Sequence, residues 1–157
     1  MKIGLDSNVL VASVKKRGEP YHRSAIELSR KISQEPMFSV ASALVLIEVP
    51  GALASSTKMP IEKIYEVCAS LQTSFNLRIM NFESYADLAR ELMFEFRELK
   101  STWEIGSADF HHIATSIGDG CDLFVTTDEK HLLRAECRKN LDRRIKIVNP
   151  DEAVSVL

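Results

Sequence analysis

The chain has 157 residues, of which 45% are hydrophobic and 27% are charged, as in an ordinary soluble globular protein. Its 20 Lys and Arg residues against 22 Asp and Glu give a net charge of −2, which excludes the overall positive field of a general nucleic-acid binder but not a local basic rim. The longest uncharged run, from Pro36 to Ile47, is too short to span a bilayer, and the N-terminus lacks the pattern of a secretory signal. Together with three scattered cysteines that form no zinc-type pair, these features predict a single domain, residues 1–157, in the cytoplasm.

Short apolar segments alternate with helical patterns along the chain. The segments are rich in Ile, Val, Leu and Phe, as strands buried in a parallel sheet usually are. Their alternation with helices indicates an α/β fold whose sheet is largely parallel and covered on both faces. The predicted strands are Lys2–Leu5, Met37–Val40, Leu77–Phe82, Leu123–Thr126 and Ile145–Val148.

Proline and serine residues mark the starts of the helices between these strands. Glu19 and Pro20 open a helix that runs to about Ser33. Ser42 is predicted to cap a helix that runs toward Ala54, and Pro50 should kink or divide that helix. Later helices are predicted to start at Pro60, at Ser84 (one long helix), at Ser107, after Asp128 and at Pro150.

Aspartates directly follow two of the predicted strands. Asp6 comes after the first strand, in "KIGLDSN", and Asp128 comes after the fourth, in "LFVTTDEKH". Parallel strands with right-handed connections have their carboxyl ends at one edge of the sheet, and open α/β sheets bind ligands there. We therefore expect both carboxylates at that edge.

Two further acids are expected at the same edge. Asp109 lies in the first turn of its helix, away from the apolar stripe, and Glu48 is the only charged residue in a long apolar stretch. Like charges about 4 Å apart repel by roughly 4 kcal/mol at an effective dielectric constant near 20. Four converging carboxylates therefore predict a bound cation, and ligation by oxygen alone favours Mg²⁺ or Mn²⁺.

Several of these residues also have a purely structural interpretation. Asp6, Asp109 and Asp128 could each cap a helix or turn, or interact with a helix dipole. His111 and His112 suggest a metal pair, but adjacent helical residues diverge by about 100° and should not chelate together. His112 follows Asp109 by three positions, which leaves open a role as the partner of a metal ligand.

The sequence resembles the PIN-domain nucleases over almost all of its length. The resemblance rests on "IGLDSNVLVA", on "ALVLIEVPGAL" and most specifically on "GSADFHHIATSIGDGCDLFVTTDEKHL". It implies a Rossmann-like three-layer α/β/α sandwich with a central parallel sheet of about five strands. The implied catalytic acids are Asp6, Glu48, Asp109 and Asp128, the implied metal ligands are Asp6, Asp109 and Asp128, and the implied supporting residues are Ser7, Asn8 and Thr126.

The resemblance also implies an activity and partners. PIN-domain members of this kind are endoribonucleases that use Mg²⁺ or Mn²⁺, and many compact ones are VapC-type toxins that pair with an antitoxin. Relative to the commonest small toxins, this chain is somewhat long in its helical middle. A homodimer is also implied, with apolar contributions from Leu53, Ile61, Ile64 and Tyr65.

The alternative function is a non-catalytic PIN-like scaffold that binds RNA or a protein partner. Other α/β proteins with acids at strand ends require motifs that this chain lacks. A receiver domain has an acidic pair after the first strand, a haloacid-dehalogenase-type phosphatase has D-x-D, and a dinucleotide enzyme has G-x-G-x-x-G. This chain has D-S-N at that place.

Overall fold

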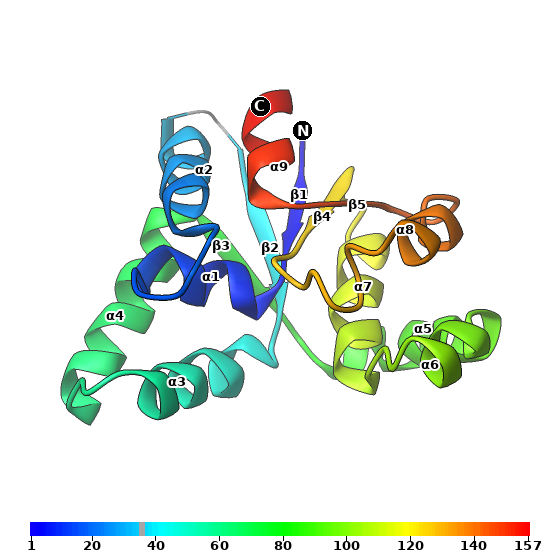
Figure 1. The fold of residues 1–157 in the computed structure, drawn as a ribbon, viewed down its shortest axis with the longest axis horizontal. Coiled ribbons are helices and arrows are strands. Elements are labelled where there is room, and N and C mark those ends of the chain that lie inside the picture. The colour runs from blue at the N-terminus through cyan, green and yellow to red at the C-terminus, as the bar shows by residue number, and fades with distance from the viewer. Residues whose placement is uncertain (35–36) are drawn as a thin grey trace.

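The computed structural model describes residues 1–34 and 37–157, and its centre is a five-stranded, all-parallel sheet. The strands are β1 (Ile3–Leu5), β2 (Ser39–Ser42), β3 (Leu77–Met80), β4 (Leu123–Val125) and β5 (Lys146–Val148). Their order in the sheet is β3-β2-β1-β4-β5. The chain therefore runs outward from β1 to β3 and then returns to place β4 on the other side of β1 (Figure 1).

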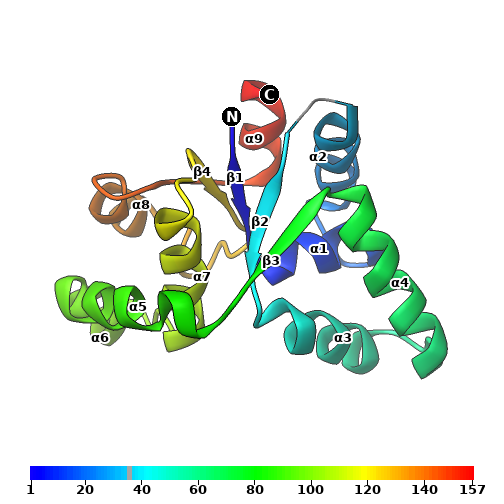
Figure 2. The ribbon, with the colours of Figure 1, turned by 180° about the vertical axis from the view of Figure 1, so that it is seen from behind.

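Helices cover both faces of this sheet, which gives the predicted three-layer sandwich. Figure 1 shows the two helical layers on either side of the strands, and Figure 2 shows the same separation from behind. One layer consists of α1 (Ser7–Val14), α2 (His22–Gln34), α3 (Val45–Ser56), α4 (Ile61–Ser74) and α9 (Pro150–Val156). The other consists of α5 (Glu83–Glu95), α6 (Arg97–Thr102), α7 (Ser107–Gly118) and α8 (Ala135–Leu141).

Side chains along the strands alternate between two apolar cores, one under each helical layer. In β1, Ile3 and Leu5 belong to the core beneath α1–α4, whereas Gly4 faces α7. A Cβ atom on Gly4 would lie 1.9 Å from Oγ of Ser116, so only glycine lets α7 approach the strand this closely. Phe124 of β4 belongs to the second core, on the same side as α7.

The structure adds α1, a helix that the sequence did not predict; the predicted order of the other elements is confirmed, with a shift at β2. This strand was expected to begin at Met37 but lies two residues later. Ser42 is consequently the last residue of β2 and not the cap of α3, which has no side-chain capping bond. The Ser42 hydroxyl is instead 2.8 Å from Nδ1 of His111, which joins β2 to α7.

Two helices differ from the prediction in where they are continuous and where they are broken. Pro50 lies inside α3 and does not divide it. Val49 and Leu53 on either side are buried, so both halves of α3 are held against the core despite the hydrogen bond that proline removes. The long helix predicted from Ser84 is in fact two helices, because the backbone leaves the helical region at Phe96.

No helix within residues 1–34 and 37–157 has the length and apolar character needed to cross a membrane.

Candidate active site

Polar side chains gather where the strand order reverses, at the carboxyl ends of β1 and β4. Asp6 directly follows β1, and Asp128 follows β4 after two threonines. Asp109 lies in the first turn of α7 and Glu48 in the first turn of α3. In open parallel sheets the crevice beside such a reversal is the usual place for a ligand.

Asp6 is the most enclosed of these acids, with only 4% of its surface exposed. Its Oδ2 accepts hydrogen bonds from the Thr126 hydroxyl at 2.7 Å and from Nδ2 of Asn8 at 2.9 Å. The Ser7 hydroxyl lies 3.4 Å from Oδ1. Asp6 makes no side-chain capping bond to α1, so its interpretation as a helix cap is wrong.

Asn8 and Thr126 join the segment after β1 to the segment after β4. Oδ1 of Asn8 accepts a hydrogen bond from the backbone N–H of Thr127 at 3.0 Å, and Nδ2 of Asn8 lies 3.1 Å from Oγ1 of Thr126. The same Thr126 oxygen accepts the backbone N–H of Asp128 at 3.1 Å. These bonds fix the backbone positions of Asp6 and Asp128 relative to each other.

Both Asp109 and Asp128 accept hydrogen bonds from nearby backbone N–H groups. Oδ2 of Asp109 accepts the backbone N–H of Gly106, the residue before α7, at 2.7 Å. Oδ1 of Asp128 accepts the backbone N–H groups of Lys130 and His131 at 3.1 and 3.2 Å, and Nδ1 of His131 lies 3.0 Å from Oδ2. A carboxylate offers about four acceptor positions, so these bonds leave both groups able to bind something further.

The acids affect one another electrostatically. Burial raises the pKa of Asp6 above its ordinary value, and the negative charge of Glu48 raises it too, although His112 acts in the opposite direction. Burial also raises the pKa of Asp109, and the charges of Asp6 and Asp128 contribute to that rise. The site therefore concentrates negative charge that its own hydrogen bonds do not fully compensate.

Glu48 is held by a histidine from the opposite helical layer. Nε2 of His112 lies 2.8 Å from Oε2 of Glu48, and the His112 side chain is 2% exposed. This hydrogen bond lowers the pKa of Glu48. Burial alone would lower the pKa of His112, but the bond to Glu48 and the charges of Asp6, Glu48 and Asp109 outweigh it, so the pKa of His112 is raised.

The donor chemistry at this edge fits a hard divalent cation, because Asp6, Asp109 and Asp128 offer only oxygen atoms. In the side-chain arrangement described for residues 1–34 and 37–157, however, no group of three His, Cys, Asp or Glu residues is placed so that it could hold a metal ion. Each acid is instead hydrogen-bonded to its protein neighbours. Burial is the main cause of the raised pKa values of Asp6 and Asp109, and the neighbouring carboxylates add to it; a cation bound there would offset both effects.

The contact between His112 and Glu48 was not predicted from the sequence, where the two residues are 64 positions apart. One sequence feature did point to His112 as a residue of the site. It follows Asp109 by three positions, which places both side chains near one face of α7. The neighbouring His111 contacts Ser42 and the carbonyl oxygen of Phe82, the latter at 2.9 Å. The two histidine rings thus have separate hydrogen-bond partners.

Residues 3–136 of the sequence match the PIN domain family. The chain belongs to this family. PIN domains are generally nucleases and generally use divalent metal ions. No curated protein sequence matches the chain significantly.

Two solved structures share the fold of this PIN domain. FitAcB from Neisseria gonorrhoeae superposes with a TM-score of 0.62 at 18% sequence identity, covering 96% of this chain and 98% of that one. VapBC2 from Rickettsia felis, solved bound to a DNA fragment from its promoter, gives a TM-score of 0.56 at 18% identity, covering 95% of this chain and 98% of that one. At this level of identity the similarity establishes the fold.

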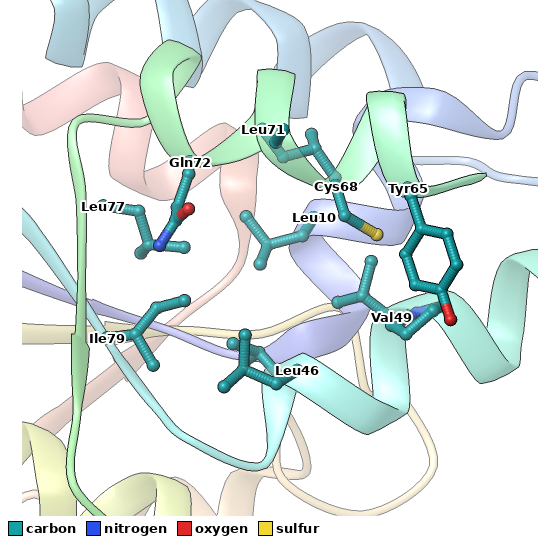
Figure 3. Close-up of a pocket in the computed structure, with 12 residues that line it drawn as sticks. Leu10, Leu46, Val49, Tyr65, Cys68, Leu71, Gln72, Leu77 and Ile79 are labelled. Atoms are coloured by element: carbon teal, nitrogen blue, oxygen red, sulfur yellow. The ribbon is translucent and has the colours of Figure 1, made fainter. Parts of the chain in front are cut away.

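An apolar groove opens on the helical layer that carries Glu48. It has a volume of about 280 Å³ and runs between α3 and α4, with β3 and α1 at its base (Figure 3). Leu46 and Tyr65 on its walls are 60% and 63% exposed. Other lining residues include Leu10, Val49, Cys68, Leu71, Gln72, Leu77 and Ile79. Large exposed side chains around an apolar groove are typical of a surface that binds another chain.

Proposed function

We propose that this PIN domain is a Mg²⁺- or Mn²⁺-dependent endoribonuclease that hydrolyses RNA phosphodiester bonds. The observation that carries the proposal is the set of four acids, Asp6, Glu48, Asp109 and Asp128, placed around the reversal point of a parallel sheet in a nuclease family. The raised pKa values of Asp6 and Asp109 support it, because they mark a site that favours a cation.

In this proposal Asp6, Asp109 and Asp128 hold the metal, and Glu48 either binds it or orients the attacking water. The bound ion would supply a water activated at neutral pH and would compensate the charge of the scissile phosphate. Asn8 and Thr126 keep the carboxylate of Asp6 in place through the bonds described above. Neither a histidine nor a lysine is required as a nucleophile.

The test is cleavage of a mixed RNA pool with Mg²⁺ or Mn²⁺ and with EDTA. Wild-type protein should cleave only with the metal, and Asp6→Asn should lose most activity, by a factor of at least about 100. Asp142→Asn makes the same change at an exposed position after α8 and should retain full activity. Undiminished cleavage in EDTA, or by Asp6→Asn, would refute the mechanism. Binding of RNA without any cleavage would favour the alternative, a non-catalytic scaffold.

We also propose that the protein is the toxin of a toxin–antitoxin pair. The two similar structures support this, since they are named as VapBC2 and FitAcB. The groove between α3 and α4 offers an apolar surface to an antitoxin segment, and one of its walls, α3, is the helix that carries Glu48. The test is co-purification with the product of a small adjacent gene and inhibition of RNA cleavage by that product. Leu46→Lys should weaken both.

A homodimer is proposed as well, with only two of the four apolar contacts first expected. Leu53 and Ile64 are 0% and 3% exposed and belong to the core, so they are not available to a second copy. Ile61 and Tyr65, at 59% and 63% exposed, remain available, and Ile47 is a further exposed apolar residue at 70%. Light scattering at micromolar concentration should give twice the mass of one chain, and a monomeric mass would exclude the dimer.

A further inference from the structure

We propose that His112 positions the carboxylate of Glu48 for phosphodiester hydrolysis, an inference that rests on the nuclease function proposed above. His112 is not among the acids or supporting residues of the site, and its ring approaches Glu48 from a different helical layer. It acts through Glu48 and not on the substrate itself.

The contact is short and enclosed on the histidine side. Nε2 of His112 is 2.8 Å from Oε2 of Glu48, with 2% of the His112 side chain exposed but 30% of the Glu48 side chain. A glutamate on a helix surface samples several rotamers, and fixing such a side chain costs conformational entropy. A bond from a buried ring selects one of those rotamers before substrate arrives.

The backbone of His112 is itself held firmly. The hydroxyl of Ser116 bonds to the His112 carbonyl oxygen at 3.0 Å, and Ser116 is the residue that packs directly on Gly4 of β1. On the other side, His111 ties α7 to Ser42 of β2. The His112 ring is therefore carried by a stretch of helix fixed against two central strands, which is the kind of rigid support that orients a reactive group.

Glu48 is the one polar partner of the His112 ring among the described residues. Nδ1 is buried and has no hydrogen-bond partner within residues 1–34 and 37–157. An ionised carboxylate only accepts hydrogen bonds, so Nε2 must carry a proton and donate. A histidine kept for stability would be expected to satisfy both nitrogens, as His111 does with Ser42 and Phe82. His112 instead directs its single bond at a residue of the acidic site.

A double-mutant cycle on RNA cleavage tests this inference. His112→Leu should lower kcat by about 10- to 100-fold, as loss of such a partner typically does, and leave KM nearly unchanged. His112→Gln, whose amide can donate from nearly the same place as Nε2, should restore most of kcat. In the Glu48→Ala background, which removes the acceptor, His112→Leu should cause almost no further loss, because its effect passes through Glu48. His111→Gln is the control: it removes a buried histidine without touching an acid and should reduce stability but not kcat of the folded protein.

Two results would overturn the inference. One is an equal loss of kcat from His112→Leu in the wild-type and Glu48→Ala backgrounds. The other is a failure of His112→Gln to restore activity while circular dichroism shows it folded. If wild-type protein cleaves no RNA with either metal, the proposed function fails instead. The contact is then tested alone by NMR of metal-free protein: a protected Nε2–H signal of His112 that is lost in Glu48→Ala supports it, and an Nδ1–H tautomer refutes it.

Discussion

Replacing Asp109 by asparagine removes one negative charge from the acidic site while keeping the shape of the side chain. In metal-free protein this change should stabilise the fold. Burial and the charges of Asp6 and Asp128 raise the pKa of Asp109, so the ionised form is unfavourable in the folded state. The asparagine carbonyl can still accept the backbone N–H of Gly106, which the Asp109 carboxylate accepts in the wild-type protein.

The expected gain is about 1 kcal/mol in the free energy of unfolding. Two unit charges about 8 Å apart repel by about 2 kcal/mol at an effective dielectric constant near 20. Against this, a carboxylate in the first turn of a helix gains about 0.3–1 kcal/mol from the helix dipole, which Asp109→Asn gives up. The difference corresponds to a rise in Tm of roughly 2–4 °C for a chain of this size.

The pH dependence has a definite sign. Because the folded-state pKa of Asp109 is raised, the folded protein binds a proton more readily than the unfolded chain. The advantage of Asp109→Asn should therefore vanish below about pH 4, the ordinary aspartate pKa, and grow as the pH rises through the raised value. Thermal melts in EDTA between pH 4 and 8 measure this difference.

Metal should reverse the order of stability. At 100 times its dissociation constant, Mg²⁺ would stabilise wild-type protein by about 2.7 kcal/mol and should stabilise Asp109→Asn far less. Asp151→Asn is the matched control, since Asp151 is an exposed aspartate in the first turn of α9; it should be neutral or slightly destabilising and should not alter the response to Mg²⁺. If Asp109→Asn melts lower than wild type in EDTA and both respond equally to Mg²⁺, Asp109 is only a helix-capping residue.

Three further predictions concern single side chains elsewhere. Gly4→Ala should lower the free energy of unfolding, measured by urea denaturation, by about 2–4 kcal/mol, because the new Cβ would overlap Ser116. Gly51→Ala has open space within α3 and should raise the same free energy by about 0.5–1 kcal/mol. Burial raises the pKa of Tyr21 to about 12, so ultraviolet titration should find one tyrosine ionising near that pH, with its stabilising contribution lost as the pH rises through that value. Burial also raises the pKa of the Cys121 thiol to about 12, so its reaction with a disulfide reagent at pH 8 should be far slower than that of a free thiol; a rate equal to a free thiol would refute the burial of Cys121.

The sequence by itself determined the number of strands, the parallel sheet and the edge at which the acids lie, but not the helix α1. These follow from local rules, since strand composition and the position of Asp6 directly after an apolar segment can be read from adjacent residues. Right-handed connections then place Asp6 and Asp128 on the same edge without knowledge of any long-range contact. The sequence determines the continuity of helices less well. Proline usually breaks a helix, but burial of Val49 and Leu53 keeps α3 continuous through Pro50.

Only the tertiary structure decided which side chains meet at that edge. Asp6 bonds to Thr126, 120 positions away, and Glu48 bonds to His112, 64 positions away. The first pair depends on β4 lying beside β1 in the sheet. The second depends on how α7 packs against the sheet, with its close approach at Gly4, and not on any pattern near Glu48. The pKa shifts of the acids also depend on the tertiary structure, because burial and the distances between charges are set only when the helical layers pack on the sheet.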